Sequence, residues 1–192
     1  MSIRTGRLLL RPLKLSDAPD IQRLAGDRDV AATTRDIPHP YEDGMAETWV
    51  GSCQERIDAG ELVIFAITLL PDGSFLGVIG LELDDNGSEA ELGYWVGKPF
   101  WDQGYATEAV KGMLRHGLDE LGLDRVYAAH FTRNPAAGRV MHKAGMFHEG
   151  FLKGHTEKWG TFEDLELYGV TRDQCIGSAS SEAGVLRPHD QL

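Results

Sequence analysis

The 192-residue sequence predicts a single α+β domain built on a mixed, mostly antiparallel sheet. The first observation is a run of three strand-like segments between residues 62 and 96, separated by the turn sequences PDG (71–73) and DDNGS (84–88). The second is the order of the remaining chain: an amphipathic helix pattern, another strand-like segment, a second helix pattern and a closing pair of strand-like segments. Adjacent strands with alternating helices and strands after them are typical of this fold class.

Composition and charge exclude several functional classes. Thirty acidic residues against nineteen basic ones give a formal net charge of −11, which argues against a nucleic-acid partner, because phosphate contacts are built from Lys and Arg. The apolar run near the start is short and is interrupted by Arg11 and Lys14, so it resembles neither a secretory signal nor a membrane span. Cys53 and Cys175 lack metal-ligand spacing and are too few for a disulfide framework. We therefore expect a cytoplasmic protein with no membrane partner.

The first half of the chain is predicted to form a strand, a short helix, a loop and a second helix. These segments are residues 7–15, 16–27, 31–44 and 45–58. The helix at 45–58 is indicated by apolar residues at four-residue steps, namely Met45, Trp49, Cys53 and Ile57. The loop is rich in Thr, Pro, Asp and Gly, and is long enough to bend over a substrate.

The strands of the central run are predicted at 62–70, 74–83 and 89–96. The clearest helix of the chain begins near Ala106, where apolar residues recur at three- and four-residue steps as far as Leu121.

The last third is predicted as a strand, a helix and a hairpin. A strand at 124–132 precedes a helix that begins at Asn134-Pro135 and ends at Gly145. The hairpin comprises residues 147–159 and 162–171, with Gly160 in its turn. Residues 176–192 show no periodicity and are predicted to be a loose tail after a domain spanning 1–175.

The stretch FWDQGYATEA (100–109) is the first candidate binding site. A helix usually begins after a Ser, Thr, Asp or Asn that accepts from its first free N–H groups, but Gly104 stands at that place. The free amides and the helix dipole together form an anion site suited to a pyrophosphate, unless Gly104 only relieves a tight turn. Walker and Rossmann glycine patterns are absent, and the seven histidines have no metal-ligand spacing.

Two motifs in this order carry a family resemblance. AELGYWVGKPFWDQGYATEA (90–109) and NPAAGRVMHKAGMF (134–147) look like motifs of the GNAT acyltransferase superfamily, most closely of its RimJ and RimL ribosomal-protein alanine N-acetyltransferase group. The resemblance covers residues 7 to 172. It implies a seven-stranded sheet splayed between its fourth and fifth strands, with acetyl-CoA in the split. The spacing of the histidines separately predicts no metal site.

The resemblance also implies which residues hold the donor. Backbone groups of Trp95, Val96 and Gly97 bind the pantetheine amides, and Asn134 bonds the same arm unless it only caps its helix. The pyrophosphate is held by the amides of Gln103, Gly104, Tyr105, Ala106 and Thr107. Trp101 stands where the family usually has Gln or Arg, so phosphate binding depends mainly on the main chain.

For catalysis, Glu91 is the candidate base and the Val96 N–H the candidate donor to the thioester oxygen. Strand alternation places Glu91 on one face with Gly93 and Trp95. Glu82 and Glu89 are weaker candidates.

The resemblance implies an acid that protonates the leaving thiolate, but its usual positions here hold Ala137 and Met141, which cannot donate a proton. Either Tyr94 or Tyr105 takes this role, or the thiolate leaves without an acid, since the pKa of a thiol is near 8.5.

Near the expected cofactor, Arg139 and Lys143 share one helix face. They are expected either to offset the negative charge of the cofactor or simply to be solvated.

The predicted activity is transfer of an acetyl group to a primary amine, either on a peptide or on a small molecule, by direct attack in a ternary complex. An amine of low pKa, such as a protein α-amine, is the easier acceptor. Two alternatives remain: an acyl-CoA-binding sensor without turnover, which the loss of a proton donor favours, and an antibiotic-modifying enzyme, which an acidic pocket would suit. The chain is expected to be a monomer or a homodimer, with the final hairpin as a possible dimer edge.

Overall fold

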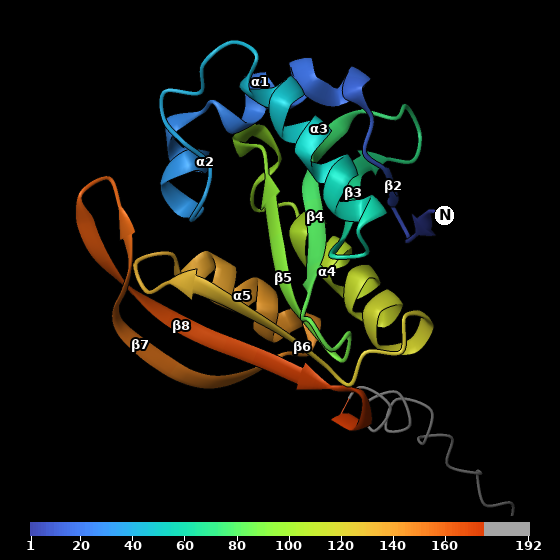
Figure 1. Cartoon of the computed structure of the whole chain (residues 1–192), viewed down its shortest axis with the longest axis vertical. Helices are drawn as coiled ribbons and strands as arrows, with labels where there is room; N and C mark the ends of the chain where they lie inside the picture. Colours follow the sequence, from blue (N-terminus) through green and yellow to red (C-terminus); the bar gives the residue numbers. More distant parts are fainter. Residues whose placement is uncertain (175–192) are drawn as a thin grey trace, which may run out of the picture.

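The computed structural model describes residues 1–174, which form one eight-stranded sheet with helices on both faces (Figure 1). The order across the sheet is β1-β2-β3-β4-β5-β6-β8-β7. The strands are β1 (Ile3–Arg4), β2 (Leu8–Pro12), β3 (Leu62–Leu69), β4 (Phe75–Leu83), β5 (Glu89–Val96), β6 (Arg125–Phe131), β7 (Phe147–Lys158) and β8 (Thr161–Thr171). The helices are α1 (Ala18–Ala25), α2 (Arg28–Thr33), α3 (Met45–Asp58), α4 (Tyr105–Arg115) and α5 (Pro135–Ala144).

The sheet divides two apolar cores. On one face, α4 and α5 pack through residues such as Val110, Met113 and Met141 against the sheet. On the other face, α1 and α3 pack through residues such as Ile21 and Val50 over β3 and β4. Each core buries apolar side chains from alternate positions of the same strands, which is the arrangement that the period-2 pattern of the strands requires.

The sheet is antiparallel except between β5 and β6, and this pair opens into a split (Figure 1). The register runs from Glu89–Arg125 to Glu91–Tyr127 and extends no further within residues 1–174. Beyond Glu91, β5 therefore lacks a strand partner on this side. The predicted splay between the fourth and fifth long strands is confirmed.

Two predictions about the N-terminal half were wrong in detail. The sheet has eight strands rather than seven, because the two-residue β1 pairs with β2 at Ile3–Leu10, and a strand so short shows no alternation in sequence. The predicted loop 31–44 begins inside α2, whose first turn is capped by the Asp27 carboxylate accepting from the Asp29 N–H at 2.8 Å.

Helix α3 has the predicted bounds, but the side chains that it buries are not all those that the four-residue pattern predicted. Ala46, Val50 and Cys53 are buried, whereas Met45 and Ile57 are exposed. Helix α4 continues into a π-helical turn at His116–Glu120, in which buried His116 contacts Glu120 through Nδ1 at 2.9 Å.

The proposed tail at 176–192 and Cys175 lie outside the described residues. Within residues 1–174, no helix has both the length and the apolar character needed to cross a membrane.

Candidate active site

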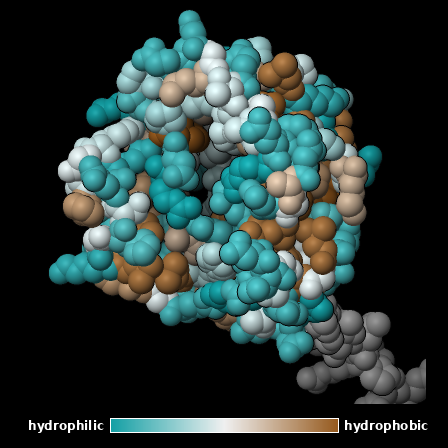
Figure 2. Space-filling model, viewed as in Figure 1, coloured by the Kyte–Doolittle hydropathy of each residue, from teal (hydrophilic) through white to brown (hydrophobic). Residues whose placement is uncertain are grey.

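A cavity of about 700 Å³ occupies the split between β5 and β6, and the space-filling view shows the corresponding hollow near the centre of one face (Figure 2). It has two ends. The helix end is formed by the start of α4 and by α5, and includes Tyr105, Ala106, Thr107 and Asn134. The loop end is formed by the segment after α2 and by neighbouring strands, and includes Arg35, Asp36, Tyr41, Trp49, Glu82 and Glu91.

The first turn of α4 presents free amides to the helix end. Gly104 is the N-cap residue, with φ of 80°, and has no side chain to accept from the helix. The first intrahelical bond runs from the Glu108 N–H to the Gly104 carbonyl at 3.1 Å. Of the described residues, none supplies a side-chain cap for this helix, so the N–H groups of Tyr105, Ala106 and Thr107 are available to an anion.

The register of β4 and β5 decides which backbone groups enter the split. The Gly97 N–H donates to the Leu76 carbonyl at 2.8 Å, which makes Leu76–Gly97 a hydrogen-bonded pair of the antiparallel ladder. Alternation then directs the backbone groups of Trp95 toward β4 and those of Tyr94 and Val96 into the split. The Gly97 N–H is thus used within the sheet and alternation turns the Trp95 groups toward β4, so Tyr94 and Val96 are the residues whose backbone groups face the split.

Trp101 ties the loop before α4 to the end of β5. Its indole Nε1–H donates to the Val96 carbonyl at 2.7 Å, so this carbonyl is engaged within the protein. The side chain of Gln103 turns back and donates to the Pro99 carbonyl at 3.0 Å, and Gln103 is not part of the cavity wall. The structure thus places Gln103 beside the loop rather than inside the site.

Arg7 is a residue that sequence reasoning missed. Its Nη1 donates to the Gln103 carbonyl at 3.0 Å, and its guanidinium lies 4.5 Å from the ring centre of Tyr105. Its Nε also donates to the Glu108 carboxylate at 2.7 Å. From just before β2, the chain therefore supplies a cation beside residues 100–104, which carry no Lys or Arg of their own. No local pattern links residues so far apart in sequence.

Asn134 occupies the N-cap of α5, but its side chain makes no capping hydrogen bond within the described part of the chain. The amide lines the cavity instead. Arg139 and Lys143 of α5 also line the helix end, so this end combines free amides, an amide side chain and two cations.

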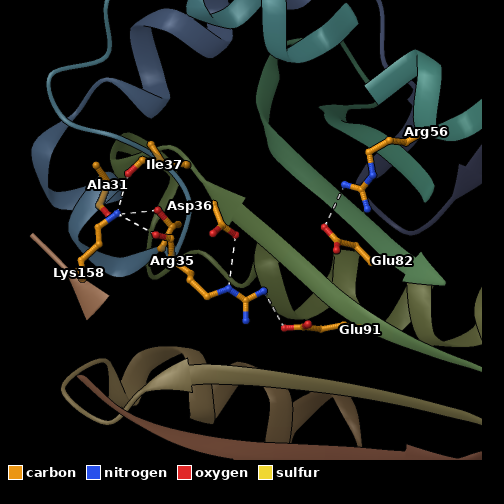
Figure 3. Close-up of polar contacts among 9 residues, drawn as sticks. Ala31, Arg35, Asp36, Ile37, Arg56, Glu82, Glu91 and Lys158 are labelled. Atoms are coloured by element: carbon orange, nitrogen blue, oxygen red, sulfur yellow. Dashed lines mark hydrogen bonds and ion pairs between the residues drawn. The ribbon is translucent and has the colours of Figure 1, made fainter. Parts of the chain in front are cut away.

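Glu91 lies at the loop end, on the face of β5 that strand alternation predicted. Its Oε1 is 3.0 Å from Nη2 of Arg35, and the Arg35 Nε lies 3.5 Å from Asp36 (Figure 3). Burial lowers the pKa of Arg35, but the carboxylates of Glu91 and Asp36 outweigh it and raise the pKa overall. Arg35 therefore stays charged beside Glu91.

The two weaker candidates are engaged elsewhere. Glu82 lines the cavity but accepts from Nη1 of Arg56 at 3.3 Å (Figure 3). Glu89 accepts from Arg125 at 2.7 Å and is not part of the cavity wall.

The tyrosines considered as proton donors are packed. The Tyr94 hydroxyl donates to the Ala137 carbonyl at 3.5 Å, and burial raises the pKa of Tyr94, so it keeps its proton and is a poor acid toward a thiolate. Tyr105 lies under Arg7. Ala137 and Met141 line the cavity and have no proton to give.

The segment after α2 is fixed from across the cavity. Lys158 at the tip of the β7–β8 hairpin donates to the carbonyls of Arg35 at 3.3 Å and Ile37 at 2.7 Å (Figure 3). Lys158 is only 6% exposed, and burial lowers its pKa. Trp49 both lines the cavity and packs against the α1–α3 core. The loop 31–44, which was expected to bend over a substrate, is thus held in place near its start by these two hydrogen bonds.

Comparison with known proteins agrees with this geometry. The family model described as "Acetyltransferase (GNAT) domain" matches residues 7–147. The chain belongs to the GNAT acetyltransferase family. It is an acyltransferase, as the resemblance implied.

Relatives of this GNAT chain include the probable N-acetyltransferase YjcK of Bacillus subtilis, 30% identical over 85% of this chain and 93% of its own. Among solved structures, RimL, a ribosomal L7/L12 α-N-protein acetyltransferase in complex with coenzyme A, superposes with a TM-score of 0.82 at 17% identity, covering 91% of this chain and 99% of RimL. Mycobacterium smegmatis RimJ in complex with CoA-disulfide gives 0.78 at 23% identity, covering 93% of each chain. These two likenesses show the shared fold.

Across residues 1–174, no three His, Cys, Asp or Glu side chains gather as a metal site would require.

Proposed function

We propose that this enzyme transfers the acetyl group of acetyl-CoA to the nitrogen of a primary amine by direct attack. The observation that carries the proposal is one cavity that holds three kinds of group: free amides at the start of α4, unpaired backbone groups of β5, and the carboxylate of Glu91. RimL and RimJ, which share the fold, are in complex with CoA species. The anionic donor fits the helix end, and the amine approaches from the loop end.

The donor is held mainly by the main chain. The N–H groups of Tyr105, Ala106 and Thr107 bind the diphosphate, since a helix N-terminus favours an anion. Arg139 and Lys143 add positive charge from α5. In the split, the pantetheine arm takes the place of the missing strand partner, and its amide groups bond the backbone of Tyr94 and the Asn134 side chain.

The reaction needs few catalytic groups. The amine nitrogen forms a bond to the thioester carbon, and the Val96 N–H stabilises the oxygen that becomes negative. The carbon–sulfur bond then breaks, and the thiolate leaves. Because its pKa is near 8.5, it needs no strong acid in the site and takes its proton from water. The proton of the attacking amine passes through water to Glu91.

The chemistry of the amine restricts the acceptor. A carboxylate is a far weaker base than a lysine-like amine of pKa about 10.4, and no stronger base is among the groups assigned to this site, so such an amine would stay protonated at pH 7. An α-amine, with a pKa of about 7.7–8.0, is already partly neutral at pH 7. We therefore assign the acceptor to amines of low pKa, with a protein or peptide α-amine first among them.

Thiol release from acetyl-CoA tests the proposal. Peptides with a free N-terminus should release thiol and gain one acetyl group, whereas the same peptides with a blocked N-terminus and one internal lysine should not. The rate should rise with pH toward the pKa of the α-amine. Acetylation of lysine or polyamines with no α-amine modified would overturn the acceptor assignment.

A further inference from the structure

Arg35 has more donors than its two carboxylate partners use. Its Nε lies near Asp36 and its Nη2 near Glu91, at 3.5 and 3.0 Å. Among residues 1–174, no partner faces Nη1 within hydrogen-bonding distance, and Figure 3 shows the remaining nitrogen pointing away from both carboxylates. An arginine offers five N–H donors in a planar fork that suits carboxylate or phosphate oxygens. Arg35 is part of the cavity wall.

The backbone of Arg35 is held in place before any substrate arrives. Lys158 donates to the carbonyls of Arg35 and Ile37 at 3.3 and 2.7 Å, so the hairpin tip fixes the segment on both sides of Asp36. The Lys158 side chain is almost fully buried. A guanidinium on a fixed segment loses less entropy on binding an anion than one on a free loop.

The charges at the loop end favour a substrate that carries both a positive and a negative group. Asp36, Glu82 and Glu91 are its carboxylates, and Arg35 is its one cationic side chain within the described part of the chain. An ammonium placed directly on the free edge of Arg35 would be repelled, whereas an anionic group placed there would be attracted. A molecule with an amine beside an anionic group would place the amine near Glu91 and the anion on the free edge of Arg35.

We propose that Arg35 binds an anionic group of the acceptor close to its reacting amine, so that the substrate class is an acidic or zwitterionic amine. This inference rests on the proposed function and narrows it. Because Arg35 Nη2 and Glu91 Oε1 are in contact, the two groups of the acceptor lie within a few ångströms of each other. An acidic side chain on the first or second residue of a peptide has this spacing.

The test compares acceptors that differ only in the anion. The pairs are peptides beginning with Asp or Asn, and peptides beginning with Ala-Glu or Ala-Gln. Wild-type enzyme should prefer the anionic member of at least one pair by about tenfold or more in kcat/KM, mainly through KM, because a charge-assisted bond is lost in the neutral member.

Arg35→Gln should reduce that preference to about one, with the KM for acetyl-CoA unchanged. Arg56→Gln is the matched control: it also removes a guanidinium beside a carboxylate, that of Glu82, but Arg56 is not part of the cavity wall, so the preference should persist.

The outcomes separate this inference from the proposed function. Turnover of neutral and anionic members at equal kcat/KM in every pair, or a preference that survives Arg35→Gln, overturns the role of Arg35 and leaves acetyl transfer intact. Absence of turnover with every amine overturns both.

Discussion

The indole nitrogen of Trp101 donates a 2.7 Å hydrogen bond to the carbonyl oxygen of Val96. The bond joins the loop that precedes α4 to the last residue of β5, so the free amides and the open strand edge are fixed relative to each other. The family motif usually has Gln or Arg at this position. Here the indole makes its hydrogen bond within the protein.

Trp101→Phe tests this link. The variant keeps an aromatic ring but loses the indole N–H, so we expect Kd for coenzyme A to rise about five- to tenfold, with folding stability little changed. Calorimetric titration with coenzyme A measures the effect. Trp159→Phe, which changes an exposed indole at the hairpin tip, is the control and should leave Kd unchanged. Equal Kd values for wild type and Trp101→Phe would show that the link does not organise the site.

Glu91→Gln should lower kcat/KM for an α-amine about tenfold to a hundredfold at pH 7, with the KM for acetyl-CoA unchanged. The deficit should shrink as pH rises above the pKa of the amine, because the acceptor then arrives without its proton. Glu82→Gln removes another carboxylate of the same cavity and should cost less than about threefold. If the two variants lose activity equally at all pH values, Glu91 has no special part in proton transfer.

Glu108 fastens the first turn of α4 to the N-terminal segment. It accepts from the Thr5 hydroxyl and the Arg7 N–H, each at 2.6 Å, and from Arg7 Nε at 2.7 Å. Burial alone would raise the pKa of Glu108, but these three bonds outweigh it and lower the pKa.

Because the folded pKa lies below the unfolded one, the stabilisation is full above the unfolded value of about 4.3 and is lost as pH falls through the folded value. Glu108→Gln should therefore reduce the free energy of unfolding by about 1–2 kcal/mol at pH 7, and the two proteins should converge in acid. Urea denaturation at several pH values measures this, with exposed Glu55→Gln as the control. A difference that stays constant into acid would contradict the assignment.

Gly138 leaves room for a buried histidine. A Cβ at Gly138 would lie 2.7 Å from Nε2 of His130 and 3.2 Å from the Tyr168 hydroxyl, whereas one at Gly51 of α3 meets nothing within 4 Å. His130 cannot easily turn aside, because its Nδ1–H donates to the Phe131 carbonyl at 2.9 Å.

We expect Gly51→Ala to stabilise the protein by roughly 0.5–1 kcal/mol through helix propensity. Gly138→Ala should instead destabilise it by about 1–3 kcal/mol through overpacking. Urea unfolding of both variants decides the matter: stabilisation by both would show that α5 shifts freely over β6.

Sequence reasoning found the parts of the site that depend on local pattern. Gly104 before an amphipathic helix, Asn134-Pro135 at the next helix and the alternation that places Glu91 are all short-range signals, and the structure places each as expected. The backbone roles along β5 were only partly predictable. Which of two neighbouring residues faces the split depends on the register with β4, and that register is fixed by the turn at 84–88 and by packing.

Contacts between distant segments gave no signal. By sequence alone, nothing distinguishes Arg7, Arg35 and Lys158 from ordinary surface residues. Each one contributes to the site only because the fold brings its segment to the split. These segments are the residues before β2, the loop after α2 and the tip of the β7–β8 hairpin. Helix α2 was missed because six residues are too few to show a helical period.

Acetyl transfer to an α-amine is tested most sharply by measuring, in one experiment, thiol release from acetyl-CoA and the mass of a peptide with a free N-terminal alanine. We predict thiol release that depends on the peptide, one acetyl group added at the α-amine, and no reaction when that amine is blocked. Binding of coenzyme A without thiol release in the presence of any amine would contradict acetyl transfer, as would the absence of heat on titration with coenzyme A.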